Sequence, residues 1–307
     1  MTELWDFLRG ALMTKALAAV VDAGVPGALA NGARPVTELE GDPDTLHRLL
    51  RALASDGVFQ ETEPGVFEHT EQSRLLLAPG WSEFAHLFGG VFFEATTDLT
   101  ASTAEPPFAS RFGSGFWEWL AGEPEERAAF DAAMAGERNR PAERLAALEW
   151  REDEVVVDVG GGNGALLAAL IERRPELRGI VLDLPETVRD EAALGDRIEF
   201  VAGSFFESVP AGDGYLLSGI LHDWPDDDAA RILRTIRAAA PPHARLLINE
   251  SVIRPGNDAE GAKWLDLLML LLAGGRERGE EQWRELLEST GWEPPRFLEG
   301  LIESRPA

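Results

Sequence analysis

Residues 154–164 read EVVVDVGGGNG, a short apolar run that breaks into a glycine-rich stretch. The valines are β-branched and suit a strand buried on both faces, whereas the glycines allow positive φ angles and let a ligand approach the backbone closely. The segment ALLAALIERR at 165–174 predicts a helix whose first amides face the turn. A strand, a glycine turn and a helix in this order predict a nucleotide-shaped pocket.

The glycine spacing in this turn is compatible with two cofactors. Gly160, Gly162 and Ala165 match the GxGxxA pattern of dinucleotide-binding folds. Gly160, Gly162 and Gly164 match the GxGxG spacing of S-adenosylmethionine sites. The turn by itself therefore leaves both NAD and S-adenosylmethionine open.

Beyond the turn, apolar β-rich runs alternate with helical patterns, which is typical of a parallel sheet with crossover helices. The predicted strands are 155–159, 180–184, 198–203, 215–220 and 245–252. Two further runs, Arg296–Leu298 and Leu301–Ser304, have no helix between them and favour an antiparallel pair at the sheet edge. We expect an α/β, Rossmann-like domain over residues 149–307.

Residues 1–100 have a different pattern, with two apolar-periodic helical segments at 4–24 and 45–59 followed by a short β-ribbon. This arrangement predicts a mainly helical, winged-helix domain. DNA binding, the best-known use of that motif, conflicts with six basic against fifteen acidic residues up to residue 100. We expect a packing or dimerisation domain, with a ligand-sensing regulator as the alternative.

The segment 101–148 is predicted to be helical and is rich in Phe, Trp and Met. Phe130 and Met134 lie four positions apart and so share a helix face. Such a face is commonly core, but beside a cofactor it also suits the wall of an apolar substrate pocket. The sequence leaves both uses open, and we expect a helical linker that contributes to the pocket.

Composition limits the possible partners. The 54 acidic and 28 basic residues give a formal net charge of −26, which repels nucleic acid and anionic membranes. The chain has no cysteine and its five histidines lack metal-ligand spacing, so the expected metal content is none, although a carboxylate-bound magnesium ion stays open. The apolar runs are too short or too interrupted for a signal peptide or a spanning helix. We expect a cytoplasmic protein with neither nucleic-acid nor membrane partners.

Two of the predicted strands end on side chains that can carry chemistry. Asp183 ends the second strand, where a carboxylate either accepts both hydroxyls of a ribose or caps the next helix. His222 follows the fourth strand in SGILHDWPDDDAARIL, at the sheet edge where open α/β folds bind ligands. An imidazole there titrates near neutral pH and is able to take a proton from a hydroxyl, but a buried structural histidine fits the position equally well.

The order of several motifs resembles one enzyme family. The motifs are DVGGGNG at 158–164, LDLP at 182–185, VAGSFFESVP at 201–210, LHDWPDDDAARIL at 221–233, NES at 249–251 and GGRERG at 274–279. This set is similar to class I S-adenosylmethionine-dependent O-methyltransferases of the type that methylates plant phenolics and bacterial aromatic polyketides. The resemblance covers nearly the whole chain. It implies S-adenosylmethionine as cofactor, a hydroxyl of a small aromatic molecule as acceptor, and a homodimer formed through the winged-helix domain.

The resemblance also implies roles for individual residues. His222 is the implied general base, Glu250 and Glu277 are implied to orient it or flank the acceptor hydroxyl, and Asp223 is implied to lie beside the base close to substrate. The implied cofactor-binding residues are Gly160, Gly161, Gly162, Asp183, Leu184, Ser204, Phe205 and Ser218. The expected acceptor-binding residues are Phe130, Met134, Asp266 and Met269.

The chain departs from the family pattern at a few positions. GSFF replaces the GDFF or GDMF of many members, so Ser204 stands where a carboxylate meets the adenine, and Ser218 stands where plant members have a lysine. The amino terminus is also shorter than is usual in the family. This leaves open whether the chain has the family's arm that crosses to a partner subunit. An NAD-dependent dehydrogenase and an S-adenosylmethionine-dependent enzyme with a different reaction are the alternatives.

Overall fold

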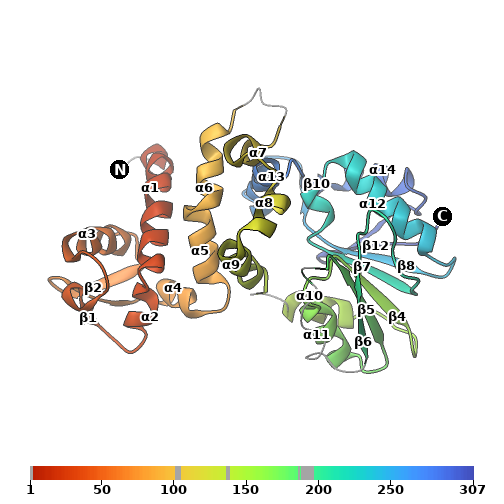
Figure 1. The fold of residues 1–307 in the computed structure, drawn as a ribbon, viewed down its shortest axis with the longest axis horizontal. Coiled ribbons are helices and arrows are strands. Elements are labelled where there is room, and N and C mark those ends of the chain that lie inside the picture. The colour runs from red at the N-terminus through yellow and green to blue at the C-terminus, as the bar shows by residue number, and fades with distance from the viewer. Residues whose placement is uncertain (1–2, 101–104, 136–138, 186, 188–196) are drawn as a thin grey trace. The chain divides into compact units, whose positions relative to one another are not determined.

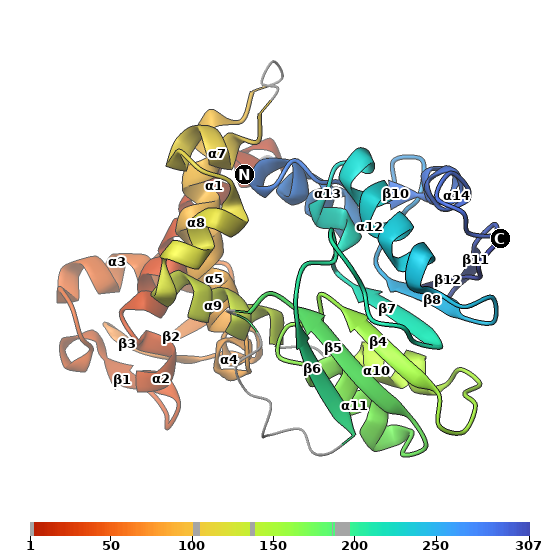
Figure 2. The ribbon, with the colours of Figure 1, turned by 45° about the vertical axis from the view of Figure 1, so that its right-hand side comes forward.

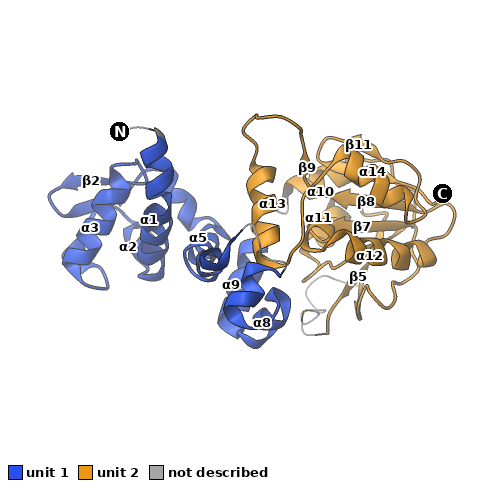
Figure 3. Ribbon diagram, turned by 90° about the horizontal axis from the view of Figure 1, so that it is seen from above, with its two compact units in different colours: residues 1–136 blue, residues 137–307 orange. Residues whose placement is uncertain are grey.

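The computed structural model describes residues 3–100, 105–135, 139–185, 187 and 197–307. The chain forms two compact units, residues 1–136 and 137–307 (Figure 3). The division falls inside the segment 101–148 that the sequence predicts as a linker. Helix α9 (Pro124–Ala135) packs against α5 (Trp81–Gly89), whereas α10 (Asn139–Ala146) packs against α11 (Ala165–Arg173). The segment is therefore shared between the two units and does not form a part of its own.

The first unit is mainly helical and carries one small sheet. Its further elements are α1 (Glu3–Asp22), α2 (Val25–Leu29), β1 (Arg34–Pro35), α3 (Pro43–Ala54), β2 (Phe59–Glu63), β3 (Val66–His69), α4 (Glu71–Arg74), α6 (Val91–Ala95), α7 (Pro107–Phe112) and α8 (Phe116–Gly122). Asp42 caps α3 by accepting the backbone N–H of Thr45 at 2.9 Å. Leu50, Phe59 and Phe67 lie in the core beneath the sheet, whose order is β1-β3-β2. The predicted helices and β-ribbon are confirmed.

The second unit contains a seven-stranded sheet with helices on both faces (Figure 1). Its further elements are β4 (Val155–Val159), β5 (Arg178–Asp183), β6 (Ile198–Ala202), β7 (Gly214–Ser218), α12 (Asp226–Ala239), β8 (Arg245–Asn249), β9 (Val252–Ile253), α13 (Gly261–Leu272), β10 (Arg278–Gly279), α14 (Glu280–Glu288), β11 (Arg296–Leu298) and β12 (Leu301–Ser304). β9 and β10 form a separate two-stranded parallel ladder.

The main sheet has the strand order β11-β12-β8-β7-β4-β5-β6. Strands β8, β7, β4, β5 and β6 are parallel, while β12 runs antiparallel to both β8 and the edge strand β11. The predicted parallel sheet and antiparallel edge pair are therefore confirmed. The strand order reverses beside β4, which has β5 on one side and β7 on the other. Such a switch point is where open α/β sheets bind ligands, at the carboxyl ends of the strands.

Alternation along the strands divides the core between the two faces of this sheet. Val157 belongs to an apolar core with residues of α12 and α14, whereas Val156 belongs to one with residues of α10 and α11. Figure 2 shows where these helices lie around the sheet. Because successive side chains of a strand point to opposite faces, the apolar β-branched run Val155–Val157 suits a strand that is covered on both faces. The central strands are thereby held firmly, and this fixes the positions at which the loops at their ends begin.

Among the described residues, no helix is long and apolar enough to cross a membrane. The same part of the chain holds no group of three or more histidine, aspartate or glutamate side chains arranged to bind a metal ion. The cytoplasmic location and the lack of nucleic-acid partners stay predictions from composition.

Candidate active site

The glycine turn after β4 has a conformation that requires glycine. Gly160 and Gly162 have φ angles of 74° and 60°, in the left-handed region. A Cβ on Gly161 would lie 2.6 Å from Cγ of Asp158, so the turn also packs too closely for a side chain there. A Cβ on Gly162 would meet nothing within 4 Å, which leaves open space beside the backbone at that point. The turn can therefore accommodate a ligand against its main chain.

Asp183, at the end of β5, holds this turn in place. Its Oδ2 accepts the backbone N–H of Gly162 at 2.8 Å, and its Oδ1 accepts that of Leu184 at 2.7 Å. A carboxylate has about four acceptor positions, so two stay available for a ligand after these bonds. The side chain of Leu184, beside it, is 43% exposed. This arrangement fits the two hydroxyls of a ribose.

Two serines and a phenylalanine at the carboxyl ends of β6 and β7 complete this edge of the sheet. Ser204 follows β6, and its Oγ accepts the backbone N–H two residues further on at 3.2 Å. The Phe205 ring lies beside the glycine turn, 3.6 Å from the position of a Cβ on Gly160. Ser218, the last residue of β7, accepts a hydrogen bond from the Asn249 side chain at 2.8 Å. The hydroxyl hydrogens of both serines stay available to donate to a ligand.

His222 lies in a short 3₁₀ turn, Leu221–Asp223, in the loop between β7 and α12; residues 220–226 are called the His222 loop below. Its Nδ1 lies 2.6 Å from Oε1 of Glu277, whose side chain is fully buried. A carboxylate only accepts, so Nδ1 carries the hydrogen and Nε2 is the nitrogen left to act as a base. Asp223 Oδ1 lies 3.7 Å from Nε2.

Glu250, just after β8, contacts the backbone of the His222 loop and not the imidazole. Its Oε1 accepts the backbone N–H groups of Ile220 at 3.1 Å and Leu221 at 2.6 Å. The other oxygen, Oε2, is buried and has no hydrogen-bond partner among the described residues. Glu250 thus holds the start of the loop, whereas Glu277 orients the ring itself.

Burial and nearby charges act in opposite directions on His222. Burial disfavours the imidazolium, but the hydrogen bond with Glu277 and the charges of Asp223 and Glu250 outweigh burial and raise the pKa of His222 to about 10. Burial raises the pKa of Asp223 to about 7 and also raises that of Glu250. The site therefore stabilises a positive charge on the imidazole and proton uptake by Asp223.

Comparison with known proteins identifies the family. A family model described as an O-methyltransferase domain matches residues 92–293, and one described as an O-methyltransferase dimerisation domain matches residues 5–79. The chain belongs to the O-methyltransferase family. The NAD-dependent dehydrogenase alternative is therefore wrong.

Individual relatives of this O-methyltransferase match it over nearly their full length. Phenazine O-methyltransferase PhzM of Lysobacter antibioticus is 35% identical, over 99% of this chain and 95% of the relative. Mitomycin biosynthesis 6-O-methyltransferase of Streptomyces lavendulae is 37% identical, over 95% of this chain and 89% of the relative. The crystal structure of the neocarzinostatin-biosynthesis O-methyltransferase NcsB1 with S-adenosylmethionine and 2-hydroxy-5-methyl naphthoic acid matches with a TM-score of 0.83, at 31% identity and 96% coverage of each chain.

The four expected acceptor-binding residues of the O-methyltransferase fall in different surroundings. In the second unit, Asp266 of α13 accepts the backbone N–H of Glu277 at 2.9 Å, and Met269 of the same helix is buried. In the first unit, Phe130 of α9 packs edge-on against Trp117, with ring centroids 5.5 Å apart, while Met134 is partly exposed. Contact of these residues with the acceptor stays a prediction.

The segment 274–278 packs closely against the His222 loop. Sequence reasoning missed this contact. A Cβ on Gly275 would overlap the carbonyl oxygen of His222, and the backbone N–H of Arg276 donates to that oxygen at 2.8 Å. Gly275 and Arg276 both belong to the motif GGRERG, but within that motif the family resemblance implies a role for Glu277 alone. A glycine beside a functional glutamate is a weak signal of close backbone approach. The motif does not reveal which backbone segment lies against the glycine, because that is decided by tertiary contacts.

Proposed function

We propose that this O-methyltransferase transfers a methyl group from S-adenosylmethionine to a hydroxyl of a small aromatic acceptor, with His222 as general base. The observation that carries the proposal is the His222–Glu277 pair, in which His222 follows β7, the strand that pairs with β4. The names of the relatives support an aromatic acceptor, since they include a phenazine methyltransferase and a complex with a hydroxylated naphthoic acid.

The residues around the switch point suit this cofactor. The backbone of Gly160 and Gly162 would hold the methionine part, Asp183 the ribose, and Ser204 with Phe205 the adenine. The complex of NcsB1 with S-adenosylmethionine supports the same use of this fold. When bound, S-adenosylmethionine supplies an activated methyl group on a positively charged sulfur.

His222 has two requirements as a base, an oriented ring and a free nitrogen. Glu277 meets the first requirement by holding Nδ1, so that Nε2 takes the proton of the acceptor hydroxyl. The second requires His222 to lose the proton that its raised pKa favours at neutral pH. Any further positive charge in the site favours that loss, because it adds to the repulsion felt by the imidazolium. The same neighbouring carboxylates stabilise the imidazolium formed when Nε2 accepts the hydroxyl proton.

Positioning contributes more to this reaction than proton transfer. A positioned base accounts for about 10²- to 10⁴-fold in rate. Alignment of two reacting groups accounts for roughly 7–11 kcal/mol of the barrier. The rigid loops at the sheet edge are therefore as much a part of the machinery as the base.

We expect Asp183→Asn to weaken S-adenosylmethionine binding by about 10- to 150-fold, because hydrogen bonds to a charged group are worth about 1.5–3 kcal/mol. Isothermal titration calorimetry measures the dissociation constant. Asp227→Asn, which removes the same charge from the exposed first turn of α12, is the matched control. An unchanged dissociation constant in Asp183→Asn contradicts the ribose assignment. Binding of NADH and not S-adenosylmethionine by the wild-type protein contradicts the assignment of S-adenosylmethionine as the cofactor.

We also propose that the protein is a homodimer joined through its first unit. The dimerisation-domain match over residues 5–79 supports this, as does a group of exposed apolar side chains on α1. They are Leu4, Trp5, Phe7, Leu8 and Leu12. An isolated monomer gains nothing from such a surface, whereas a partner subunit buries it.

We expect Phe7→Glu to raise the dimer dissociation constant by at least about 10-fold, since burial of one such ring is worth about 1.5–3 kcal/mol. Size-exclusion chromatography with light scattering over a dilution series measures this. Leu99→Glu places the same charge on an exposed leucine outside the matched dimerisation domain and leaves assembly unchanged. A Phe7→Glu protein that dimerises like the wild type removes α1 from the interface.

A further inference from the structure

Arg278, next to the glutamate that orients His222, has a fully buried guanidinium. Its Nη1 donates to the carbonyl oxygen of Leu221 and its Nη2 to that of Trp224, each at 2.9 Å. Its Nε donates to Oδ1 of Asp226, also at 2.9 Å. Leu221 begins the 3₁₀ turn that carries His222, Trp224 follows that turn, and Asp226 begins α12. One planar side chain thus spans the His222 loop.

The backbone of Arg278 is itself anchored beside the other support of this loop. Arg278 pairs with Val252 in the β9–β10 ladder, two residues after Glu250. Glu250 holds the N–H groups at the start of the His222 loop, and Arg278 holds its carbonyl groups. A two-stranded ladder therefore joins the two supports of the His222 loop.

A buried guanidinium is costly unless all its surroundings are polar or aromatic. Besides its three main acceptors, the guanidinium carbon of Arg278 lies 5.3 Å from the ring centroid of Trp283. The fork geometry of arginine matches several acceptors at fixed angles, which the single nitrogen of lysine cannot do. The spacing of the loop carbonyls is thus set by the shape of the guanidinium.

We propose that Arg278 is a positioning residue that fixes the His222 imidazole relative to the acceptor hydroxyl by holding the His222 loop at both ends. This rests on the proposed function, because it takes His222 as the base. Arg278 acts through the loop and contacts neither ligand. Its loss is therefore expected to lower turnover without loosening the cofactor.

The test compares Arg278→Lys with Arg284→Lys, the same substitution at a partly exposed arginine of α14 that pairs with Glu281. We expect kcat of Arg278→Lys to fall about 10- to 100-fold, since a displacement near 1 Å at a reacting group costs about 10²-fold. Its dissociation constant for S-adenosylmethionine stays within about twofold of wild type, a split that separates positioning from binding. Arg284→Lys keeps both values. Equal losses of kcat and of cofactor affinity, or an unchanged kcat, overturn the proposal.

A second readout does not depend on methyl transfer. In histidine-labelled protein, NMR follows the His222 imidazole and the four other histidines through a pH titration. We expect Arg278→Lys to shift the His222 resonances and titration midpoint while the other four stay unchanged. If the wild type transfers no methyl group, the proposed function fails, yet this titration still tests the loop support. An unshifted His222 overturns it. Should Arg278→Lys not fold, Asp226→Ala removes the third acceptor and must move the same resonances.

Discussion

Removing the imidazole in His222→Ala lowers kcat with a phenolic acceptor by about 10²- to 10⁴-fold at neutral pH, the range that a positioned base contributes. A phenol with a pKa near 10 is mostly neutral there, so its attack depends on proton removal. Rates with saturating S-adenosylmethionine measure the effect. The wild-type rate rises with pH as His222 loses its proton, because only the neutral imidazole accepts one. The rate of the variant also rises with pH, because the phenol itself ionises and the phenolate attacks without a base, but it stays below the wild-type rate at neutral pH.

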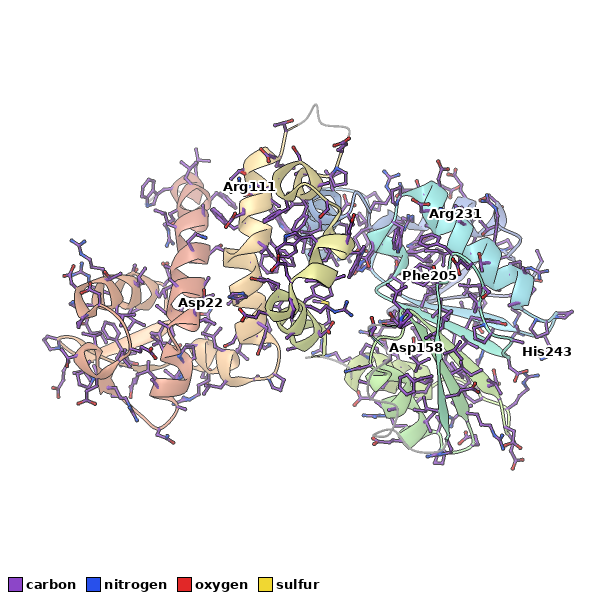
Figure 4. The ribbon with its side chains drawn as sticks, in the orientation of Figure 1. Asp22, Arg111, Asp158, Phe205, Arg231 and His243 are labelled. Carbon is purple, nitrogen blue, oxygen red and sulfur yellow. The ribbon has the colours of Figure 1, made fainter. Side chains whose placement is uncertain are left out.

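Two further variants make the His222 experiment specific. His243→Ala removes an exposed imidazole that pairs with Asp213 at the opposite end of the sheet from Phe205, and it keeps wild-type turnover (Figure 4). His222→Gln retains a polar partner for Glu277 and loses as much activity as His222→Ala. Turnover of His222→Ala equal to that of the wild type at neutral pH rules out His222 as the base.

The substitution Gly275→Ala lowers kcat by about 10²-fold, because a shift near 1 Å at a catalytic group costs about that much. The new methyl group would overlap the His222 carbonyl oxygen and lie 2.8 Å from that of Asp223. Both neighbours are backbone atoms, so the loop itself must move. Steady-state kinetics and cofactor titration together measure the outcome, and the cofactor dissociation constant stays near wild type.

Gly261→Ala is the matched control, since a Cβ at that glycine meets nothing within 4 Å. We expect its kcat and its melting temperature to equal those of the wild type. If Gly275→Ala also turns over like the wild type, the close packing of the segment 274–278 on the His222 loop has no part in catalysis.

Much of the fold could be predicted because its signals are local. The apolar run Val155–Val157 indicates a doubly covered strand, and the lack of a helix between Arg296–Leu298 and Leu301–Ser304 indicates an antiparallel pair. The helical segment 101–148 was harder to predict. Its helices have the same apolar periodicity whichever unit they pack on, and only the tertiary contacts divide them between the two units.

The residues of the site could largely be predicted from the sequence, whereas their hydrogen-bond partners could not. His222 and Glu277 could be named from the motif order, but their 2.6 Å contact joins segments far apart in the chain. Glu250 and Asp266 both use their carboxylates on backbone N–H groups, which no side-chain pattern reveals. The role of Arg278 could not be predicted from the sequence, because its three acceptors belong to a loop that lies about fifty positions earlier in the chain.

Transfer of a labelled methyl group tests the central claim most directly. The protein is incubated with S-adenosylmethionine labelled in its methyl group and with a matched pair of aromatic acceptors, one with a free hydroxyl and one with that hydroxyl already methylated. We predict label in an O-methyl ether from the free hydroxyl alone, with transfer strongly reduced in His222→Ala. Label on nitrogen or carbon, or no transfer to any acceptor by a protein that binds S-adenosylmethionine, contradicts the account.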